Sequence, residues 1–147
     1  TVYKRRLPLR EQEAADWLAG RRDCPVQCQI AAEIDYFLHY YETLRPAVFL
    51  SYEREAFAAL DGSAFRVTFD ENILCRQGEL TLDSEAYGTP VLEPGRILME
   101  LKCAGGIPLW MTRVLSAERI YKTSFPKYGT AYQNILLPAR KEAVVYA

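Results

Sequence analysis

The chain has 147 residues, half of them hydrophobic, and its 18 basic and 19 acidic side chains give a formal net charge of −1. This length fits one domain with a real core, and this composition excludes an intrinsically disordered chain. The balanced charge predicts no nucleic-acid partner, and no apolar run reaches the roughly 18 residues of a membrane span.

The four cysteines, Cys24, Cys28, Cys75 and Cys103, are too scattered for a disulfide-built domain. Cys24 and Cys28 form a CPVQC pair, but the chain has no second pair and a single histidine, His39. A zinc site is therefore not expected. Reduced thiols predict a cytoplasmic location.

The first third of the chain predicts one strand followed by two helices. Residues 2–9 have the composition of a strand, and residues 10–19 predict a short helix that Gly20 ends. Apolar residues then recur at helical spacing in residues 28–44.

The remainder predicts mainly strands. Residues 47–57, 64–75 and 96–103 each read as a strand, and Asp-Gly-Ser at 61–63 predicts a hairpin turn between the first two. A helix is expected to begin near Pro108, where proline suits a first turn. The predicted fold class is α+β with a mainly antiparallel sheet.

Alternation sorts the strand side chains onto two faces, one apolar and one rich in charge. The predicted apolar face contains Phe65, Val67, Phe69, Ile97, Met99 and Leu101. The predicted polar face contains Arg66, Thr68, Asp70, Leu98, Glu100 and Lys102. By the same alternation, Lys4 and Arg6 share a face of the first strand, and Arg54 shares one with Tyr52.

Two interpretations fit this pattern. In the first, the polar face is an ordinary solvated face of a half-buried sheet. In the second, the sheet curls into a barrel whose basic side chains line an anion-binding tunnel, while helices pack on its apolar outside. Composition does not choose between them.

Six strings, taken in order along residues 2 to 133, resemble the VTC domain of polyphosphate polymerases, most closely its bacterial members. They are KRRLPL, SYEREAF, FRVTFDENIL, LMELK, GGIPLW and TSFPKYGTAYQ. The resemblance implies the triphosphate tunnel metalloenzyme fold, an antiparallel barrel lined by Arg and Lys. It implies one such domain over residues 1–137 and a tail over 138–147. Because the family begins with further strands, we expect an N-terminally truncated domain and an incomplete barrel.

The resemblance also implies residue roles. It gives Glu100 the role of metal ligand, for Mn²⁺ or Mg²⁺. It places Ser124 among the substrate-binding residues, next to the lysine of the family's closing SFPKY motif. The residues implied to act both in catalysis and in substrate binding are Lys4, Arg6, Arg54, Arg66, Lys102 and Lys127.

The implied activity is polyphosphate polymerase-like transfer of the γ-phosphoryl group of ATP to a growing polyphosphate chain. The implied partners are ATP and polyphosphate or pyrophosphate; a membrane protein that receives the polymer is a further partner that the resemblance allows, without insertion of this chain into the membrane. Two alternatives stay open: a metal-dependent triphosphatase on the same fold, and a non-catalytic polyphosphate-binding module.

Overall fold

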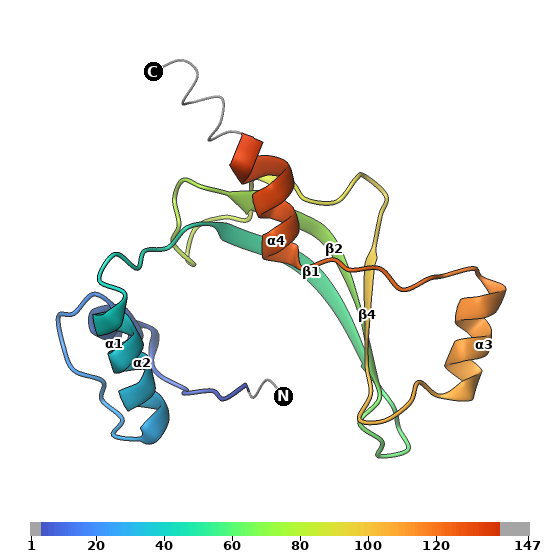
Figure 1. The fold of residues 1–147 in the computed structure, drawn as a ribbon, viewed down its shortest axis with the longest axis horizontal. Helices are drawn as coiled ribbons and strands as arrows, with labels where there is room; N and C mark the ends of the chain where they lie inside the picture. Colours follow the sequence, from blue (N-terminus) through green and yellow to red (C-terminus); the bar gives the residue numbers. More distant parts are fainter. Residues whose placement is uncertain (1–3, 139–147) are drawn as a thin grey trace. The chain divides into compact units, whose positions relative to one another are not determined.

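The computed structural model describes residues 4–138 (Figure 1). The chain divides into two units, Thr1–Arg45 and Pro46–Ala147. Each unit is treated by itself below. No helix within residues 4–138 has the length and apolar character needed to cross a membrane. The predicted C-terminal tail lies almost entirely outside the described residues.

The first unit is built on two short helices, α1 (Glu11–Leu18) and α2 (Gln29–Tyr40), as the helical spacing predicted. Its core is formed by Trp17, Cys24 and Ala31. Leu7 and Leu9 pack against this core. The prediction of a strand over residues 2–9 is wrong for the described part, because residues 4–10 adopt no regular secondary structure. Their apolar side chains pack against helices instead of pairing in a sheet.

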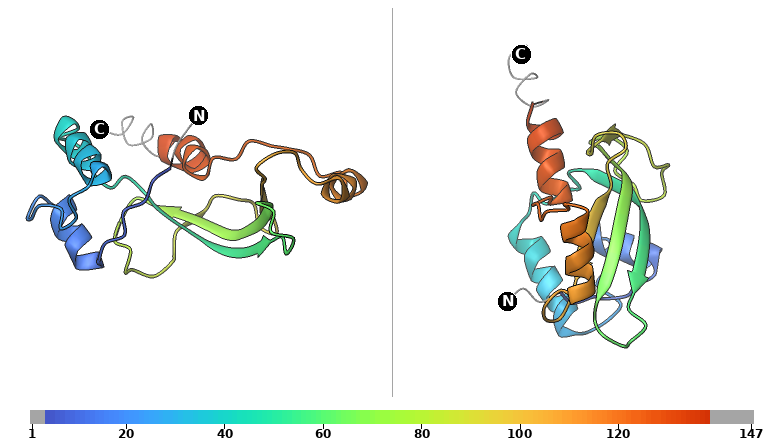
Figure 2. Two further views of the ribbon diagram at one scale, coloured as in Figure 1. Left: turned by 90° about the horizontal axis from the view of Figure 1, so that it is seen from below. Right: turned by 90° about the vertical axis from the view of Figure 1, so that its right-hand side faces the viewer.

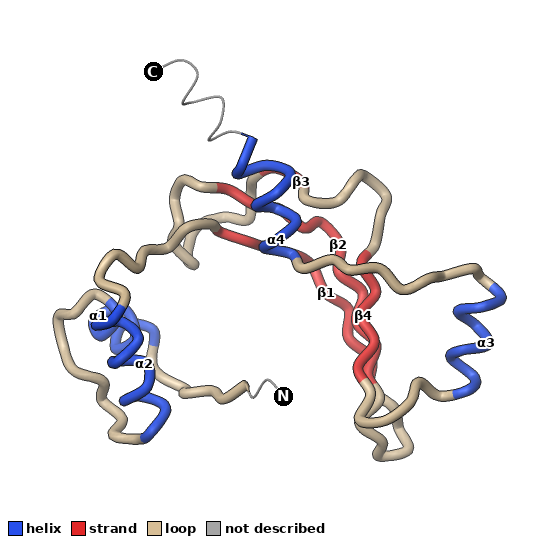
Figure 3. The backbone as a smooth tube through the Cα atoms, viewed as in Figure 1, coloured by secondary structure: helices blue, strands red, loops and turns tan. Residues whose placement is uncertain are grey.

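The second unit contains a four-stranded antiparallel sheet centred on β2 (Arg66–Arg76). One edge of β2 pairs with β1 (Phe49–Ala58). Its other edge pairs with β3 (Thr89–Pro90) and with β4 (Leu98–Lys102), at different points along its length (Figure 3). Figure 2 shows that β1 and β2 are long and curved, which gives the sheet its curl.

The hairpin that joins β1 to β2 is the predicted one. The backbone N–H of Ser63 donates to the Asp61 carboxylate at 2.9 Å, and Gly62 has a φ of 77°. A left-handed residue at this point suits glycine, which has no Cβ to oppose it. The turn therefore fixes the register of the two strands.

The register places the predicted polar residues on one face of the sheet. Arg66 lies opposite Lys102, and Thr68 lies opposite Glu100. Arg54 lies opposite Asp70. Directly opposed residues of antiparallel strands project from the same face. The alternation of FRVTFD and LMELK is thus confirmed.

The other face forms the core of the second unit, against helix α3 (Leu109–Ala117). Phe65, Val67 and Met111 are buried there, and the ring of Phe65 meets Trp110 edge-on at 5.7 Å. The partly buried residues packed around them include Phe69, Met99, Leu101 and Leu115. The prediction of an apolar face under a helix is confirmed for these strand residues. Ile97, at the end of the same predicted face, is 54% exposed and lies outside this core.

The predicted barrel is not shown. Within residues 4–138 the sheet is open, because β1 and β4 pair with β2 alone and not with each other. What holds of the predicted fold class is α+β with an antiparallel sheet and packed helices.

A long connection between β2 and β3 is organised by one side chain, Arg76. Its guanidinium is buried, with Cζ 3.7 Å from the centroid of the Phe49 ring and 4.2 Å from that of Tyr87. It donates to the carbonyl oxygens of Gly78, Glu79, Glu85 and Tyr87 and to the hydroxyl of Ser84. Residues 77–88 are thereby ordered without a helix or strand.

Candidate functional site

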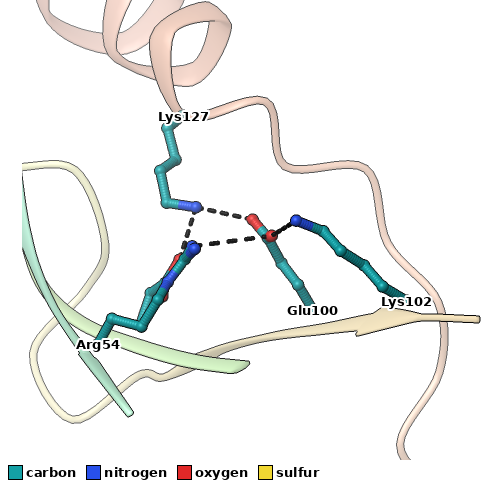
Figure 4. A network of polar contacts seen from close by, with 5 residues as sticks. Arg54, Glu100, Lys102 and Lys127 are labelled. Carbon is teal, nitrogen blue, oxygen red and sulfur yellow. Dashed lines mark hydrogen bonds and ion pairs between the residues drawn. The ribbon is translucent and has the colours of Figure 1, made fainter. Parts of the chain in front are cut away.

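Charged side chains from three strands and one helix meet on the polar face of the sheet (Figure 4). We use the name ion-pair cluster for five of them: Arg54 from β1, Asp70 from β2, Glu100 and Lys102 from β4, and Lys127 from helix α4 (Lys127–Ala131), which follows α3. Three cations and two acids give this cluster a net positive charge.

Asp70 lies at the centre of the cluster and is fully buried. Arg54 donates to both of its carboxylate oxygens, from Nε to Oδ1 at 2.5 Å and from Nη2 to Oδ2 at 2.6 Å. Lys127 Nζ lies 2.6 Å from Oδ2 as well. A buried carboxylate is tolerated only when it is paired and hydrogen-bonded, and these contacts satisfy that condition.

Lys127 reaches the sheet because α4 begins at this residue. Pro126 precedes the helix with a fixed backbone and accepts a hydrogen bond from Thr130 N–H at 2.8 Å. A Cβ on Gly129 would lie 3.0 Å from Pro126 Cγ, so this position has little room for a side chain. The PKYG sequence therefore sets where the lysine enters the cluster. Helix α4 continues into a π-helical turn, η1 (Tyr132–Leu136).

Glu100 faces three cations. Its Oε1 accepts from Lys127 Nζ at 2.7 Å, while its Oε2 lies 3.8 Å from Arg54 Nη2 and 4.0 Å from Lys102 Nζ. A third of its side chain is exposed, in contrast to Asp70. Glu100 is therefore the acid of the cluster that a ligand from solvent can reach.

A β-bulge lies at the edge of the cluster. The pairing of β1 with β2 slips between Ser51 and Glu53, so that Tyr52 faces two residues of β2. One of these, Asn72, has a φ of 49°, in the left-handed region. The ring of Tyr52 then lies under two cations, 4.9 Å from Arg54 Cζ and 4.8 Å from Lys127 Nζ.

The three central ionisable groups are held in their charged forms. Hydrogen bonds from Arg54 lower the pKa of Asp70 below its ordinary value of 3.8, and Lys127 adds to the effect. The hydrogen bond from Lys127 lowers the pKa of Glu100 below 4.5. Burial alone would lower the pKa of Lys127, but its hydrogen bonds to the two acids outweigh burial and raise it above 10.5.

Two predicted cations on this face, one of them a cluster member, are exposed to solvent. Arg66 is exposed and lies opposite Lys102, whose side chain is 56% exposed. Both cations are accessible to solvent, so both can bind an anion from solution.

Among the predicted site residues of the second unit, Ser124 also lies outside the cluster. Ser124 is exposed on the segment before α4, and within residues 4–138 it makes no side-chain hydrogen bond. Lys4 and Arg6 belong to the first unit and are exposed there. Their roles stay predictions.

Sequence reasoning placed Asp70 on the polar face but gave it no role. Thr68, also on this face, is buried, and its hydroxyl has no hydrogen-bond partner in the part of the chain that the structure describes. Tyr52 was noted only as a neighbour of Arg54. The alternation of β2 pointed to the first two, while the ring contact of Tyr52 depends on the bulge.

Comparison with protein families identifies the family of this chain. The model of the VTC domain family matches residues 1–136. The chain belongs to the VTC domain family. The matched range covers the first unit, most of the second unit and every residue of the ion-pair cluster. Comparison with curated proteins and with solved structures gives no match.

Membership in the VTC domain family indicates the general kind of function of this chain. The family is associated with polyphosphate metabolism, so a polyphosphate-related function is indicated for the chain. In this VTC domain, the cluster offers what such a ligand needs, namely fixed guanidinium and ammonium donors on one face of a sheet.

Proposed function

We propose that this VTC domain transfers the γ-phosphoryl group of ATP to the end of a polyphosphate chain. The observation that supports the proposal is the ion-pair cluster, in which Asp70 holds both Arg54 and Lys127. Lys102 of the cluster and Arg66 beside it are exposed on the same face of the sheet. Condensed phosphates carry about one negative charge per phosphate, and arginine and lysine are the side chains that bind them.

In the proposed reaction, a terminal oxygen of the acceptor chain attacks the γ-phosphorus of ATP. The bond between that phosphorus and the oxygen bridging to the β-phosphate breaks, ADP leaves, and the acceptor is longer by one phosphate. Arg54 and Lys127 stabilise the charge that spreads over the transferred group. No covalent nucleophile from the protein is needed.

The residues present fit a divalent cation that shares its ligands with the substrate. No group of three or more His, Cys, Asp or Glu side chains in residues 4–138 could hold a metal ion alone. Mg²⁺ and similar hard ions are often bound by one or two carboxylates together with substrate phosphates. The partly exposed Glu100 would be that carboxylate, and Mn²⁺ or Mg²⁺ would supply neutralisation of the phosphate oxygens.

A second candidate function is polyphosphate binding without turnover. It is favoured by the contact between Glu100 and Lys127, since an acid that pairs with a lysine has a structural role without any metal. A triphosphatase, in which water replaces the acceptor chain, requires the same residues as the polymerase.

Product analysis tests the proposal. The protein is incubated with ATP and either Mn²⁺ or Mg²⁺, and the products are separated by length. Phosphate chains longer than the triphosphate of ATP support the polymerase. Free phosphate alone indicates the triphosphatase. If neither forms while polyphosphate still raises Tm by several degrees more than sulfate at equal ionic strength, the protein is a binding module.

A further inference from the structure

The cluster contains one acid that no substrate role explains, Asp70. It is fully buried, so it cannot be reached by a ligand from solvent while Arg54 and Lys127 cover it. It nevertheless makes the shortest contacts in the cluster. Its function must therefore be exerted through the cations that it holds.

The way Asp70 holds Arg54 determines which donors remain. The carboxylate binds the side of the guanidinium formed by Nε and Nη2. The guanidinium has a fixed, planar set of five N–H donors. On the edge formed by Nη1 and Nη2, Nη1 makes no hydrogen bond within residues 4–138, and Nη2 has only the carboxylate of Glu100 nearby, at 3.8 Å and so beyond hydrogen-bond distance. That edge can grip a phosphate in bidentate fashion.

One oxygen of Asp70 also sets the distance between two cations. Arg54 Nη2 and Lys127 Nζ each lie 2.6 Å from Oδ2. Two positive groups repel each other, and a carboxylate oxygen between them offsets the repulsion. The pair is thus held as neighbours before any anion arrives, although the two residues come from β1 and from α4.

We propose that Asp70 is a positioning residue, which fixes Arg54 and Lys127 as a pair whose remaining donors bind the non-bridging oxygens of condensed phosphates. This inference rests on the proposed function in one respect only, the choice of a condensed phosphate as ligand. It deepens that function by explaining why an anion site has a buried acid at its centre.

Charge alone predicts the opposite behaviour, which makes the inference testable. Removing any acid from an anion site should strengthen anion binding by Coulomb attraction. Removing the acid that aligns the donors should weaken the binding of a ligand that needs them aligned. Glu100 provides the matched control, because Glu100→Gln and Asp70→Asn each remove one negative charge from the same cluster.

The experiment measures the affinity of inorganic triphosphate and of sulfate by calorimetry, without divalent cations and well below the Tm of every variant. Asp70→Asn is expected to weaken triphosphate binding about tenfold or more, the value of a lost bidentate, charge-assisted contact. Sulfate binding should change little. Glu100→Gln is expected to bind triphosphate as well as or better than the wild type.

Two further variants keep the inference falsifiable. Asp70→Glu retains the charge but moves the oxygens by one methylene group, so it should also lose about tenfold in triphosphate affinity. In an Arg54→Gln background, Asp70→Asn should weaken triphosphate binding much less than in the wild type, because the group it positions is gone. If Asp70→Asn does not fold, Asp70→Glu decides.

The outcomes separate the inference from the proposed function. Unchanged or tighter triphosphate binding by Asp70→Asn or by Asp70→Glu overturns the positioning role. Tenfold weaker binding with no polymer formed by the wild type supports the positioning role and overturns the polymerase. A wild-type protein that binds triphosphate no better than sulfate overturns both.

Discussion

The two faces of one sheet in this VTC domain are stabilised in opposite ways. The face under α3 is a core of apolar side chains, with Phe65 and Val67 buried against Met111. The other face buries a charge, Asp70, and surrounds it with cations. The comparison teaches that a strand with alternating residues can bury side chains on both faces of the sheet. On the polar face, hydrogen bonds fix the positions of the side chains because they are directional. Apolar contacts on the other face are not directional.

The largest loss of stability is expected from a substitution on the apolar face. Phe65→Ala removes a buried ring that contacts Trp110, and the unfolding free energy is expected to fall by about 3–4 kcal/mol. Below the melting transition, triphosphate affinity should stay within about twofold of the wild type. Urea unfolding and calorimetry measure the two quantities.

Phe57→Ala is the matched control, because Phe57 lies on the same face but is 56% exposed. It should cost about 1 kcal/mol or less. Equal losses for the two phenylalanines would show that the face under α3 is not the core. A large loss of triphosphate affinity in Phe65→Ala would show that the two faces are not independent.

The next effect concerns the buried acid. Asp70→Asn leaves Arg54 and Lys127 without their shared partner, and it should lower the unfolding free energy by about 2 kcal/mol at pH 7. The value is below that of a fully buried pair because Arg54 is 30% exposed and can be hydrated.

The same variant has a defined pH dependence. The pKa of Asp70 is lower in the fold than its ordinary 3.8, so the unfolded chain takes up the proton first. The stability that Asp70 contributes is therefore present above about pH 4 and is lost as the pH falls further. Urea unfolding at pH 7 and pH 3 should show the wild type and Asp70→Asn converging at the lower pH. A constant difference would contradict the charged, hydrogen-bonded state of this acid.

A smaller effect is expected from an exposed cation. Lys102→Gln should change the unfolding free energy by less than about 0.5 kcal/mol, because Lys102 is mostly exposed and lies 4.0 Å from Glu100. One charge near a bound anion is worth about 1 kcal/mol in water at 4 Å, so triphosphate affinity should fall about fivefold. A loss of stability larger than the loss of binding energy would contradict a ligand-facing role for Lys102.

The smallest effect tests an unpaired hydroxyl. Thr68 Oγ1 is buried without a hydrogen-bond partner in residues 4–138. Thr68→Val keeps the shape and removes the hydroxyl, so the unfolding free energy should stay the same or rise by no more than about 0.5 kcal/mol. Thermal unfolding measures it. A loss above about 1 kcal/mol would reveal that the hydroxyl is hydrogen-bonded, for example to a bound water.

Sequence alone predicted the two faces because a strand has a side-chain period of two. The pattern of FRVTFD placed Val67 and Asp70 on opposite faces, and the register confirms it. It could not predict that Lys127 would meet Asp70, because this contact joins a helix start to a strand and depends on the whole path between them. The importance of Asp70 was missed for the same reason.

Local pattern failed where a strand needed a partner. Residues 4–9 have strand composition, yet a strand exists only when another strand pairs with it. Leu7 and Leu9 instead bury their side chains against Trp17. Closure of the sheet likewise depends on pairing between distant strands. The alternation within one strand does not predict which other strand it pairs with.

The arginine that organises residues 77–88 has a consequence for protease digestion. Trypsin cleaves after arginine, but it must first draw an extended stretch of chain around that residue into its active site. The guanidinium of Arg76 is enclosed by two aromatic rings and bonded to four carbonyl groups of the connection that follows it. Cleavage at this bond therefore requires the connection to open. Its rate, compared with cleavage after Arg96, which is exposed and lies outside helices and strands, measures how often this part of the fold comes apart while the protein remains native.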